Sequence, residues 1–255
     1  YVRSWHIKNL GNILKIGSKA PGVFNFLQSS SLGRKLIGFE KNPPLLEKGS
    51  LSMWWDESKP KKDNHSVTVW VVVDIFTQYY DVDIAKDALN FLKMCNVNIN
   101  VIFPKNSIVA MISHGLLNAA KNELKLLHSE LNNATKNDLI VGIEPSEVLV
   151  WRDEARNLIN DKLPDVLLFE ELLLKLNQLE VLPKLNALNS KVWVYEHCHQ
   201  KALAETNNLT KVLGLISGLQ IEFINGGCCG MAGEFGYKHL KISEKIAHNS
   251  LDIFM

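Results

Sequence analysis

The sequence predicts an α/β protein made of two tandem Rossmann-like modules, each built on a parallel sheet and related to the other by an internal repeat. The 255-residue chain is 46% hydrophobic, which is enough to build a large core. Strand-like apolar runs alternate with helical runs, a pattern typical of parallel sheets with helices on both faces. We therefore expect a helical arm and linker at 1–66, a first module at 67–160 and a second module at 161–255.

The arm begins with apolar residues at helical spacing, which predict an amphipathic helix. These residues are Trp5, Ile7, Leu10, Ile13, Leu14 and Ile16. Such a helix packs on its own protein, lies on a membrane surface or docks a partner. The polar run Asp56–Ser66 is the best candidate for a linker.

The first module opens with Val67–Asp74, a continuous β-branched run expected in a strand buried on both faces of a parallel sheet. The later elements follow by periodicity and by their Pro and Gly boundaries. They are a helix at Val82–Met94, a strand at Val97–Phe103, a long helix at Ile112–Leu131, a strand at Leu139–Ile143 and a helix that starts at Glu144-Pro145-Ser146.

The second module repeats this order. Lys191–Glu196 alternates apolar and polar residues, which predicts a short buried strand. The remaining elements are a helix at Val166–Leu176, a helix at Leu209–Ile216, a strand at Leu219–Ile224 and a closing amphipathic helix at Glu234–Ile253.

Three of the four cysteines follow the two strands of the second module. His197, Cys198 and His199 come after the first strand, and Cys228, Cys229 and Gly230 come after the second. The carboxyl ends of parallel strands share one edge of a sheet, so the thiols are expected to converge there on a soft metal or cluster. Glycine lets the backbone approach such a ligand. In the alternative interpretation, the cysteines are small buried hydrophobic residues.

An overlay of the two modules gives the repeat. The separation of Phe76 from Asn106 in the sequence equals the separation of Cys198 from Cys228. Asn106 and Ser107 then stand opposite the vicinal cysteines, so only the second module keeps its thiols. A chance coincidence of two strand–helix–strand spacings is the alternative.

Composition excludes several functional classes. The formal net charge of +1, with no basic stripe in the core, gives no support for nucleic-acid binding. There is no nucleophile elbow, Walker loop or dinucleotide-binding glycine spacing. Four cysteines without a secretory leader indicate a reducing, cytoplasmic location. No apolar run reaches the roughly 18 residues that span a bilayer, so membrane contact would be peripheral, on the inner face.

Several motifs resemble one family. Glu196–Leu203, reading EHCHQKAL, and Gly227–Gly233, reading GCCGMAG, resemble the second-module signatures of the cysteine-rich CCG domain. Asp74–Tyr80, Ile112–Leu117 and Gly142–Ser146 look like its first-module landmarks. This domain occurs in heterodisulfide reductase, in the iron–sulfur subunits of glycolate oxidase and anaerobic glycerol-3-phosphate dehydrogenase, and in bacterial FAD-linked D-lactate or other 2-hydroxy-acid dehydrogenase fusions. The chain is most similar to the fused type.

The resemblance implies an electron-transfer role. The chain would be the carboxyl-terminal part of a longer oxidoreductase, whose upstream FAD-binding and ferredoxin-like domains oxidise the substrate. Electrons would pass through a 4Fe-4S cluster at Cys198, Cys228 and Cys229, beside Gly230, to a quinone or a protein acceptor. The chain alone would then lack the substrate-oxidising site.

The chain also departs from the family pattern. Asn106-Ser107-Ile108 replaces the first Cys-Cys-Gly, and Glu147 replaces the cysteine of Glu-Pro-Ser-Cys. Three thiolates remain where a cubane usually takes four, so Glu147, His197, His199 or an exogenous ligand is the candidate for the fourth. Two alternatives stay open, namely a zinc or thiol-redox site and a cofactor-free structural or docking domain.

Overall fold

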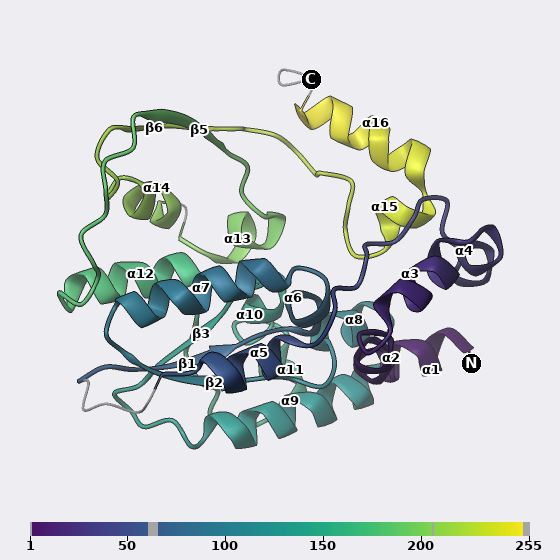
Figure 1. Ribbon diagram of the computed structural model, residues 1–255, viewed down its shortest axis with the longest axis horizontal. Helices are drawn as coiled ribbons and strands as arrows, with labels where there is room; N and C mark the ends of the chain where they lie inside the picture. The colour runs from purple at the N-terminus through teal and green to yellow at the C-terminus, as the bar shows by residue number, and fades with distance from the viewer. Residues whose placement is uncertain (1, 61–65, 206, 252–255) are drawn as a thin grey trace.

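The computed structural model describes residues 2–60, 66–205 and 207–251 (Figure 1). It confirms the parallel α/β class, because every strand pair in this part of the chain is parallel. The strands form two separate sheets, one with the order β2-β1-β3-β4 and one with the order β5-β6. The two sheets are thus of unequal size.

The four-stranded sheet has a deeply buried centre. Its strands are β1 Thr68–Val72, β2 Asn98–Ile102, β3 Leu139–Gly142 and β4 Val166–Leu167. Val69 and Val71 are completely inaccessible to solvent. This burial agrees with the continuous β-branched run in the sequence, because a parallel sheet is covered on both faces.

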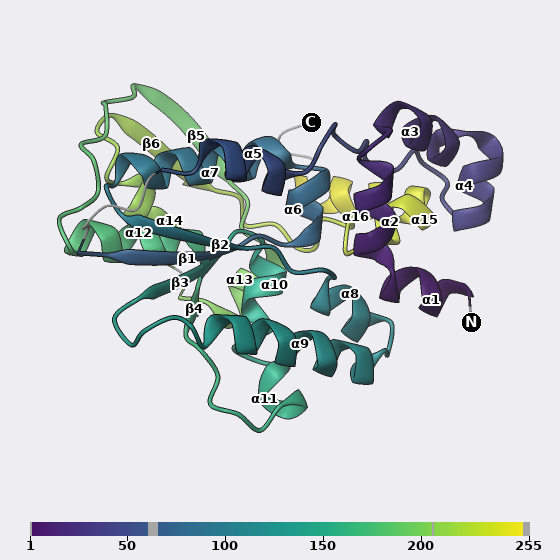
Figure 2. The ribbon, with the colours of Figure 1, turned by 60° about the horizontal axis from the view of Figure 1, so that its bottom comes forward.

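Two layers of helices cover this sheet, one on each face (Figure 2). One apolar cluster joins the sheet to α5 Leu51–Ser58, α7 Val82–Met94 and α12 Phe169–Gln178. The other joins it to α8 Ile108–Ser113, α9 Leu117–Leu131, α10 Pro145–Leu149 and α11 Ala155–Leu158.

Two expectations for this region were wrong in detail. Val166 and Leu167 are strand residues that pair with Ile140 and Val141 of β3, and the helix starts only at Phe169. The single helix expected at 112–131 is two helices, because Gly115 between them has φ +70°, a conformation that ends a helix.

The two-stranded sheet differs sharply from the first. It consists of β5 Ser190–Val194 and β6 Leu219–Phe223, joined through α13 Cys198–Leu203 and α14 Asn208–Leu213. The prediction of a buried strand was wrong here, since no residue of β5 or β6 is buried and Trp193 is 47% exposed. The alternating pattern identified the strand, but no third strand flanks this pair in the described residues.

The N-terminal arm folds as short helices beside α6 Ile75–Tyr79. The expected amphipathic helix is split into two, and its Leu14 is buried against Leu46, Ile75 and Tyr79. The arm helices are α1 Val2–Lys8, α2 Leu10–Gly17, α3 Pro21–Ser29 and α4 Ser31–Ile37. The first residues of the expected linker belong to α5, and its residues 61–65 lie outside the described residues.

The chain closes with α15 Phe235–Lys238 and α16 Leu240–Leu251, which are separated at His239. The last two residues of the predicted closing helix lie outside the described residues. None of the helices in the described part of the chain has the length and apolar character needed to cross a bilayer.

Candidate functional site

Cys198 is the first residue of α13, just beyond the carboxyl end of β5. A capping box fixes this helix start: His197 Nδ1 accepts from His199 N (3.3 Å), and Gln200 Oε1 accepts from His197 N (3.2 Å). The cap fixes the backbone conformation of the Glu-His-Cys-His segment. The Cys198 side chain is exposed.

Cys228 and Cys229 lie just beyond the carboxyl end of β6, in a loop held by side-chain donors. The Tyr195 hydroxyl donates to Gly227 O, and Lys201 Nζ donates to Gly226 O (3.1 Å). Ser250 Oγ of the closing helix donates to Cys228 O (2.9 Å). These contacts fix the loop backbone, while Cys228 is exposed and Cys229 is half-buried.

Gly230 is required by its conformation and by its surroundings. Its φ is +78°, and an added Cβ would lie 2.6 Å from Ser243 O. Ser243 Oγ also donates to Gly230 O (2.8 Å). In this geometry the Gly230 N–H donates to Cys228 Sγ (3.3 Å), a contact that stabilises a thiolate.

Tyr195 follows β5 and contacts the loop that bears the vicinal cysteines. Partial burial raises the pKa of its hydroxyl, and Cys229, Cys228 and Cys198 raise it further. Lys201 Nζ lies 4.6 Å from the centre of the same ring. Tyr195 and Lys201 therefore connect the segment of Cys198 to the loop of Cys228 and Cys229.

The histidines beside Cys198 lie at the start of the same helix. Their rings meet edge to face with centroids 5.3 Å apart. Burial lowers the pKa of His197, opposed by the Glu144 carboxylate, and this favours the neutral imidazole that can bind a metal. Glu144 precedes α10, and α10 packs against α13, so the first sheet supports the start of the cysteine-bearing helix.

Glu147, the other candidate for a fourth ligand, is occupied elsewhere. Its carboxylate is hydrogen-bonded to the Ser107 hydroxyl, and it accepts from Ile108 N (3.2 Å). Burial raises the pKa of Glu147 to about 8, and the Asp74 carboxylate adds to this shift. Ser107 also caps α8 by accepting from Ala110 N (3.0 Å). Glu147 and Ser107 are thus partners of each other.

Asn106 is engaged in the same way. Its backbone N–H donates to Glu123 Oε1 (3.2 Å), and its Oδ1 accepts from Gly11 N (3.3 Å). A Cβ at position 11 would lie 1.6 Å from Lys105 O, so only glycine allows α2 to approach this loop. Asn106 therefore connects the arm to the first module.

A small cavity lies at this edge of the four-stranded sheet. Its volume is about 20 Å³, room for about one water molecule. Its polar lining residues are Asp74, Asn106, Glu144 and Glu147. Because the cavity is far smaller than a cubane and its polar groups are hydrogen-bonded, the first module does not fit an iron–sulfur cluster.

Sequence reasoning missed two buried polar residues of this edge. Asp74 caps α6, where it accepts from Phe76 N (2.8 Å) and Thr77 N (3.0 Å), and burial raises its pKa. Gln78 Nε2 donates to Val73 O (2.8 Å) and Pro104 O (3.1 Å). An Asp directly after an apolar strand is a helix-cap signal that identifies the first of them.

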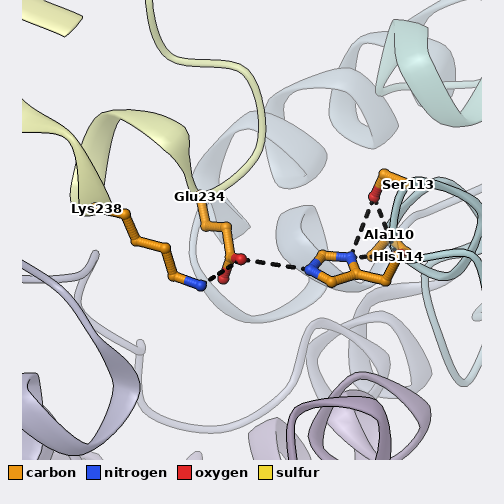
Figure 3. A network of polar contacts seen from close by, with 5 residues as sticks. All are labelled: Ala110, Ser113, His114, Glu234 and Lys238. Carbon is orange, nitrogen blue, oxygen red and sulfur yellow. Dashed lines mark hydrogen bonds and ion pairs between the residues drawn. The ribbon is translucent and has the colours of Figure 1, made fainter. Parts of the chain in front are cut away.

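A polar network missed in the sequence connects the cysteine loop to the first module. Figure 3 shows His114, Glu234 and Lys238 in line. His114 Nε2 lies 3.3 Å from Glu234 Oε1, and Lys238 Nζ is 2.5 Å from the same oxygen. His114 Nδ1 lies 2.8 Å from Ala110 O. The segment after Cys-Cys-Gly is therefore anchored to the end of α8.

The donor chemistry of the second module fits a soft metal or an iron–sulfur cluster. Cys198, Cys228 and Cys229 supply three soft ligands, and the Gly230 N–H already donates to one of the sulfurs. In the described residues, no three His, Cys, Asp or Glu side chains are arranged closely enough to hold a metal ion. The fit is therefore one of donor type, with all three thiols just beyond the carboxyl ends of two paired strands.

The chain is similar to part of several known dehydrogenases. It is 28% identical over 258 residues to D-2-hydroxyglutarate dehydrogenase of Pantoea ananatis (strain AJ13355), covering 93% of this chain. It is 28% identical over 256 residues to the protein of that name from Escherichia coli (strain K12). It is also 21% identical over 216 residues to the C subunit of the anaerobic glycerol-3-phosphate dehydrogenase of Escherichia coli (strain K12), covering 79% of this chain.

These relatives are longer proteins. The chain spans 24% of the length of the two D-2-hydroxyglutarate dehydrogenases and 53% of the glycerol-3-phosphate dehydrogenase subunit. No family model matches the chain, and no solved structure matches it. The chain is thus similar to one part of larger dehydrogenase polypeptides.

Proposed function

We propose that this chain is the iron–sulfur electron-transfer module of a flavin-linked 2-hydroxy-acid dehydrogenase. Two of its relatives carry the name D-2-hydroxyglutarate dehydrogenase, and the part matched by this chain is about a quarter of their length. The remaining length has room for an FAD-binding domain and ferredoxin-like clusters. Electrons would then reach this module and leave it for a quinone or a protein acceptor.

One observation carries this proposal: Cys198 follows β5 and the Cys228–Cys229 pair follows β6, and these two strands are parallel neighbours. The Tyr195 hydroxyl and Lys201 Nζ, on either side of Cys198, bond to Gly227 O and Gly226 O at the start of the loop that bears the vicinal cysteines. Soft thiolates at a shared sheet edge are the ligands that iron–sulfur clusters use. We propose the three sulfurs as ligands, with His197, His199 or an exogenous group as the fourth.

The bound cluster would supply one-electron redox chemistry, and the residues of the chain would set its surroundings. The Gly230 N–H donates to Cys228 Sγ, and hydrogen bonds to sulfur raise the reduction potential of a cluster. Lys201 Nζ lies over Tyr195 and donates to Gly226 O, which places a positive charge at the start of the loop of Cys228 and Cys229. Both groups favour the more negative, reduced state of a centre held there.

Anaerobic reconstitution with iron and sulfide tests the proposal. The wild-type chain is expected to take up iron and labile sulfide and to give a low-temperature EPR signal after reduction. Cys228→Ser removes a ligand and is expected to lower the iron content several-fold. Cys95→Ser is the matched control, because Cys95 is buried in the other module, where burial raises its pKa to about 11.

Two outcomes contradict the proposal. The first is a wild-type chain without iron under these conditions. The second is a Cys228→Ser variant that takes up as much iron as the wild type, since the loss of a ligand would then have no effect. Stoichiometric zinc in place of iron would instead favour the zinc or thiol-redox alternative.

The second candidate is a cofactor-free docking domain of the same kind of oxidoreductase. The hydrogen bonding of Ser107 to Glu147 favours it, because a site that has lost its thiols has become structural. On this hypothesis, replacing Cys198, Cys228 and Cys229 by Ser leaves acceptor reduction by the parent enzyme unchanged. A large loss of acceptor reduction, with the circular dichroism unaltered, excludes it.

We also propose that the two units are copies of one module. The first unit extends beyond the expected boundary at residue 160, because β4 pairs with β3 and α12 packs on the first sheet. The parallel registers support this proposal: Thr68 pairs with Asn98 and Ser190 pairs with Leu219, at nearly equal separations along the sequence. In both units a helix begins just after the first strand, at Ile75 in one and at Cys198 in the other.

A further inference from the structure

Helix α3 in the N-terminal arm is oriented with its polar side inward. Asn25 Nδ2 donates to Leu46 O (3.0 Å), and Asn25 Oδ1 accepts from Leu46 N (2.9 Å). Gln28 Nε2 donates to Pro44 O (2.9 Å). These bonds fix the rotation of the helix against the segment around Pro44 and Leu46. Its amide side chains therefore face the protein.

The opposite side of α3 is apolar and faces solvent. Val23, Phe26 and Leu27 follow the i, i+3, i+4 spacing of one helix face, and each is more than half exposed, Phe26 at 73%. Phe24 of α3 packs against the buried cluster that contains Leu14 and Leu46. An ordinary surface helix turns its whole apolar stripe toward the core, whereas these three side chains of α3 face solvent. Such an orientation is costly in water unless another surface covers it.

Helix α4 continues the apolar surface. Leu32 and Leu36 lie one turn apart on it, and Leu36 is 79% exposed. The Ser30 Oγ cap, which accepts from Gly33 N (3.0 Å), joins the two helices directly. Figures 1 and 2 both show α3 and α4 projecting together from one end of the molecule, away from both sheets. We define the α3–α4 apolar face as Val23, Phe26, Leu27, Leu32 and Leu36.

The segment of the sequence that contains this face has an excess of basic residues. Residues 11–48 contain six lysines or arginines and two glutamates, although the whole protein has a net charge of only +1. Lys35 lies between Leu32 and Leu36 on the exposed side of α4, and it is exposed itself. Exposed apolar side chains among cations are the pattern that binds anionic lipid surfaces, where each basic residue near the surface adds about 1 kcal/mol.

We propose that the α3–α4 apolar face binds the surface of an anionic lipid bilayer. Its helices have 9 and 7 residues, too short to cross a bilayer, so they lie in the interface with their apolar side chains inserted. The local excess of cations selects a negatively charged membrane over a neutral one. This inference goes beyond the electron-transfer function, and it does not depend on whether a cluster is bound.

Co-sedimentation of the whole chain with vesicles tests the inference. Vesicles of phosphatidylcholine with about 30% phosphatidylglycerol are compared with pure phosphatidylcholine at low and high salt. We expect binding to the anionic vesicles, at least about ten-fold weaker binding to neutral ones, and a decrease with salt. The double variant Phe26→Ser/Leu36→Ser is expected to lose at least about ten-fold in affinity, because it removes two inserted side chains.

A matched control is Ile84→Ser/Leu126→Ser, which removes two apolar side chains of similar exposure from α7 and α9. This variant is expected to bind like the wild type. Three results would overturn the inference: no binding to anionic vesicles, equal loss in both double variants, or a dimer in solution that Phe26→Ser/Leu36→Ser dissociates while vesicle binding persists. A dimer that behaves in this way would assign the α3–α4 apolar face to self-association.

Discussion

The carboxyl ends of the strands differ between the two sheets of this protein. At the four-stranded sheet, polar side chains bond to one another, as Ser107 does to Glu147 and Asn106 to Glu123. Beyond the strands of the two-stranded sheet the chain carries thiols, and Cys198 and Cys228 are exposed. The first unit rests on a four-stranded sheet with a buried centre, whereas the second has a two-stranded sheet with no buried residue.

This contrast indicates that the first unit provides most of the stability, while the second unit carries the reactive thiols. Two apolar clusters and four strands hold the first unit together, and polar side chains at its strand ends bond to one another. The second unit has fewer buried side chains, and the thiols of Cys198 and Cys228 are exposed to solvent. We infer that the first unit serves as the scaffold on which the second presents its thiols, since α10 packs against α13 and His114 contacts Glu234.

The largest expected effect comes from the same substitution placed in each sheet. Val71→Ala in β1 removes a completely buried side chain and is expected to lower the free energy of unfolding by about 2.5 kcal/mol. Val192→Ala in β5 removes a half-buried side chain and is expected to cost less than about 1 kcal/mol. Urea denaturation measures both. Equal losses would mean that the two sheets are equally well packed.

The second prediction concerns Glu147, whose pKa of about 8 lies far above that of an exposed glutamate. The unfolded chain ionises Glu147 near its ordinary pKa, while the folded chain keeps the proton until about pH 8. Stability is therefore expected to fall as pH rises from about 5 to 8. Glu147→Gln should remove this dependence and be more stable than the wild type at pH 8. The control variant Glu130→Gln, at an exposed position, should keep the wild-type dependence of stability on pH. If Glu147→Gln also keeps that dependence, Glu147 does not cause it.

The third prediction tests the connection between the units. His114→Ala removes the contact to Glu234 and is expected to cost about 1 kcal/mol. Backbone amides of Ala232–Lys238 should then exchange faster with deuterium. His128→Ala, which loses a bond to Lys162 O in the first unit, should leave exchange in that segment unchanged. Unaltered exchange in His114→Ala would show that the network does not hold the cysteine loop.

The smallest effect is expected from Tyr195→Phe. This variant loses only the hydrogen bond to Gly227 O at a solvent-exposed position, so its cost in stability should be about 0.5 kcal/mol. Because the ring stays in place, Lys201 can still lie over it. Thermal unfolding of the two proteins measures the difference. A loss of several kcal/mol would mean that the phenol supports the loop much more than its exposure indicates.

Periodicity and strand signals predicted most of the first unit. The β-branched run gave β1, and the helical spacing of apolar residues gave α7 at its observed bounds, Val82–Met94. The two-residue strand β4 was missed because Val166 and Leu167 merge with the apolar pattern of α12. Alternation in β5 identified a strand with two unlike faces, but a sequence pattern does not reveal how many neighbours a sheet has.

Part of the candidate site was likewise predictable from the sequence, and part of it was not. The motif around Cys198 and the Cys228–Gly230 loop placed the thiols after two strands, because local sequence determines strand ends. The surroundings of Glu147 depend on Ser107, 40 residues away, and the contact of His114 with Glu234 spans 120 residues. Neither pairing has a local signal. The inward amides of α3 were equally hidden, because their partners are backbone groups of another segment.

Iron and labile sulfide content of single-cysteine variants tests the central claim most directly, namely that thiols from two strand ends make one centre. We predict that Cys198→Ser, Cys228→Ser and Cys229→Ser each lower the iron per chain to a similar extent, while Cys95→Ser keeps the wild-type content. A Cys198→Ser variant with undiminished iron, beside a Cys228→Ser variant without it, would contradict a shared centre.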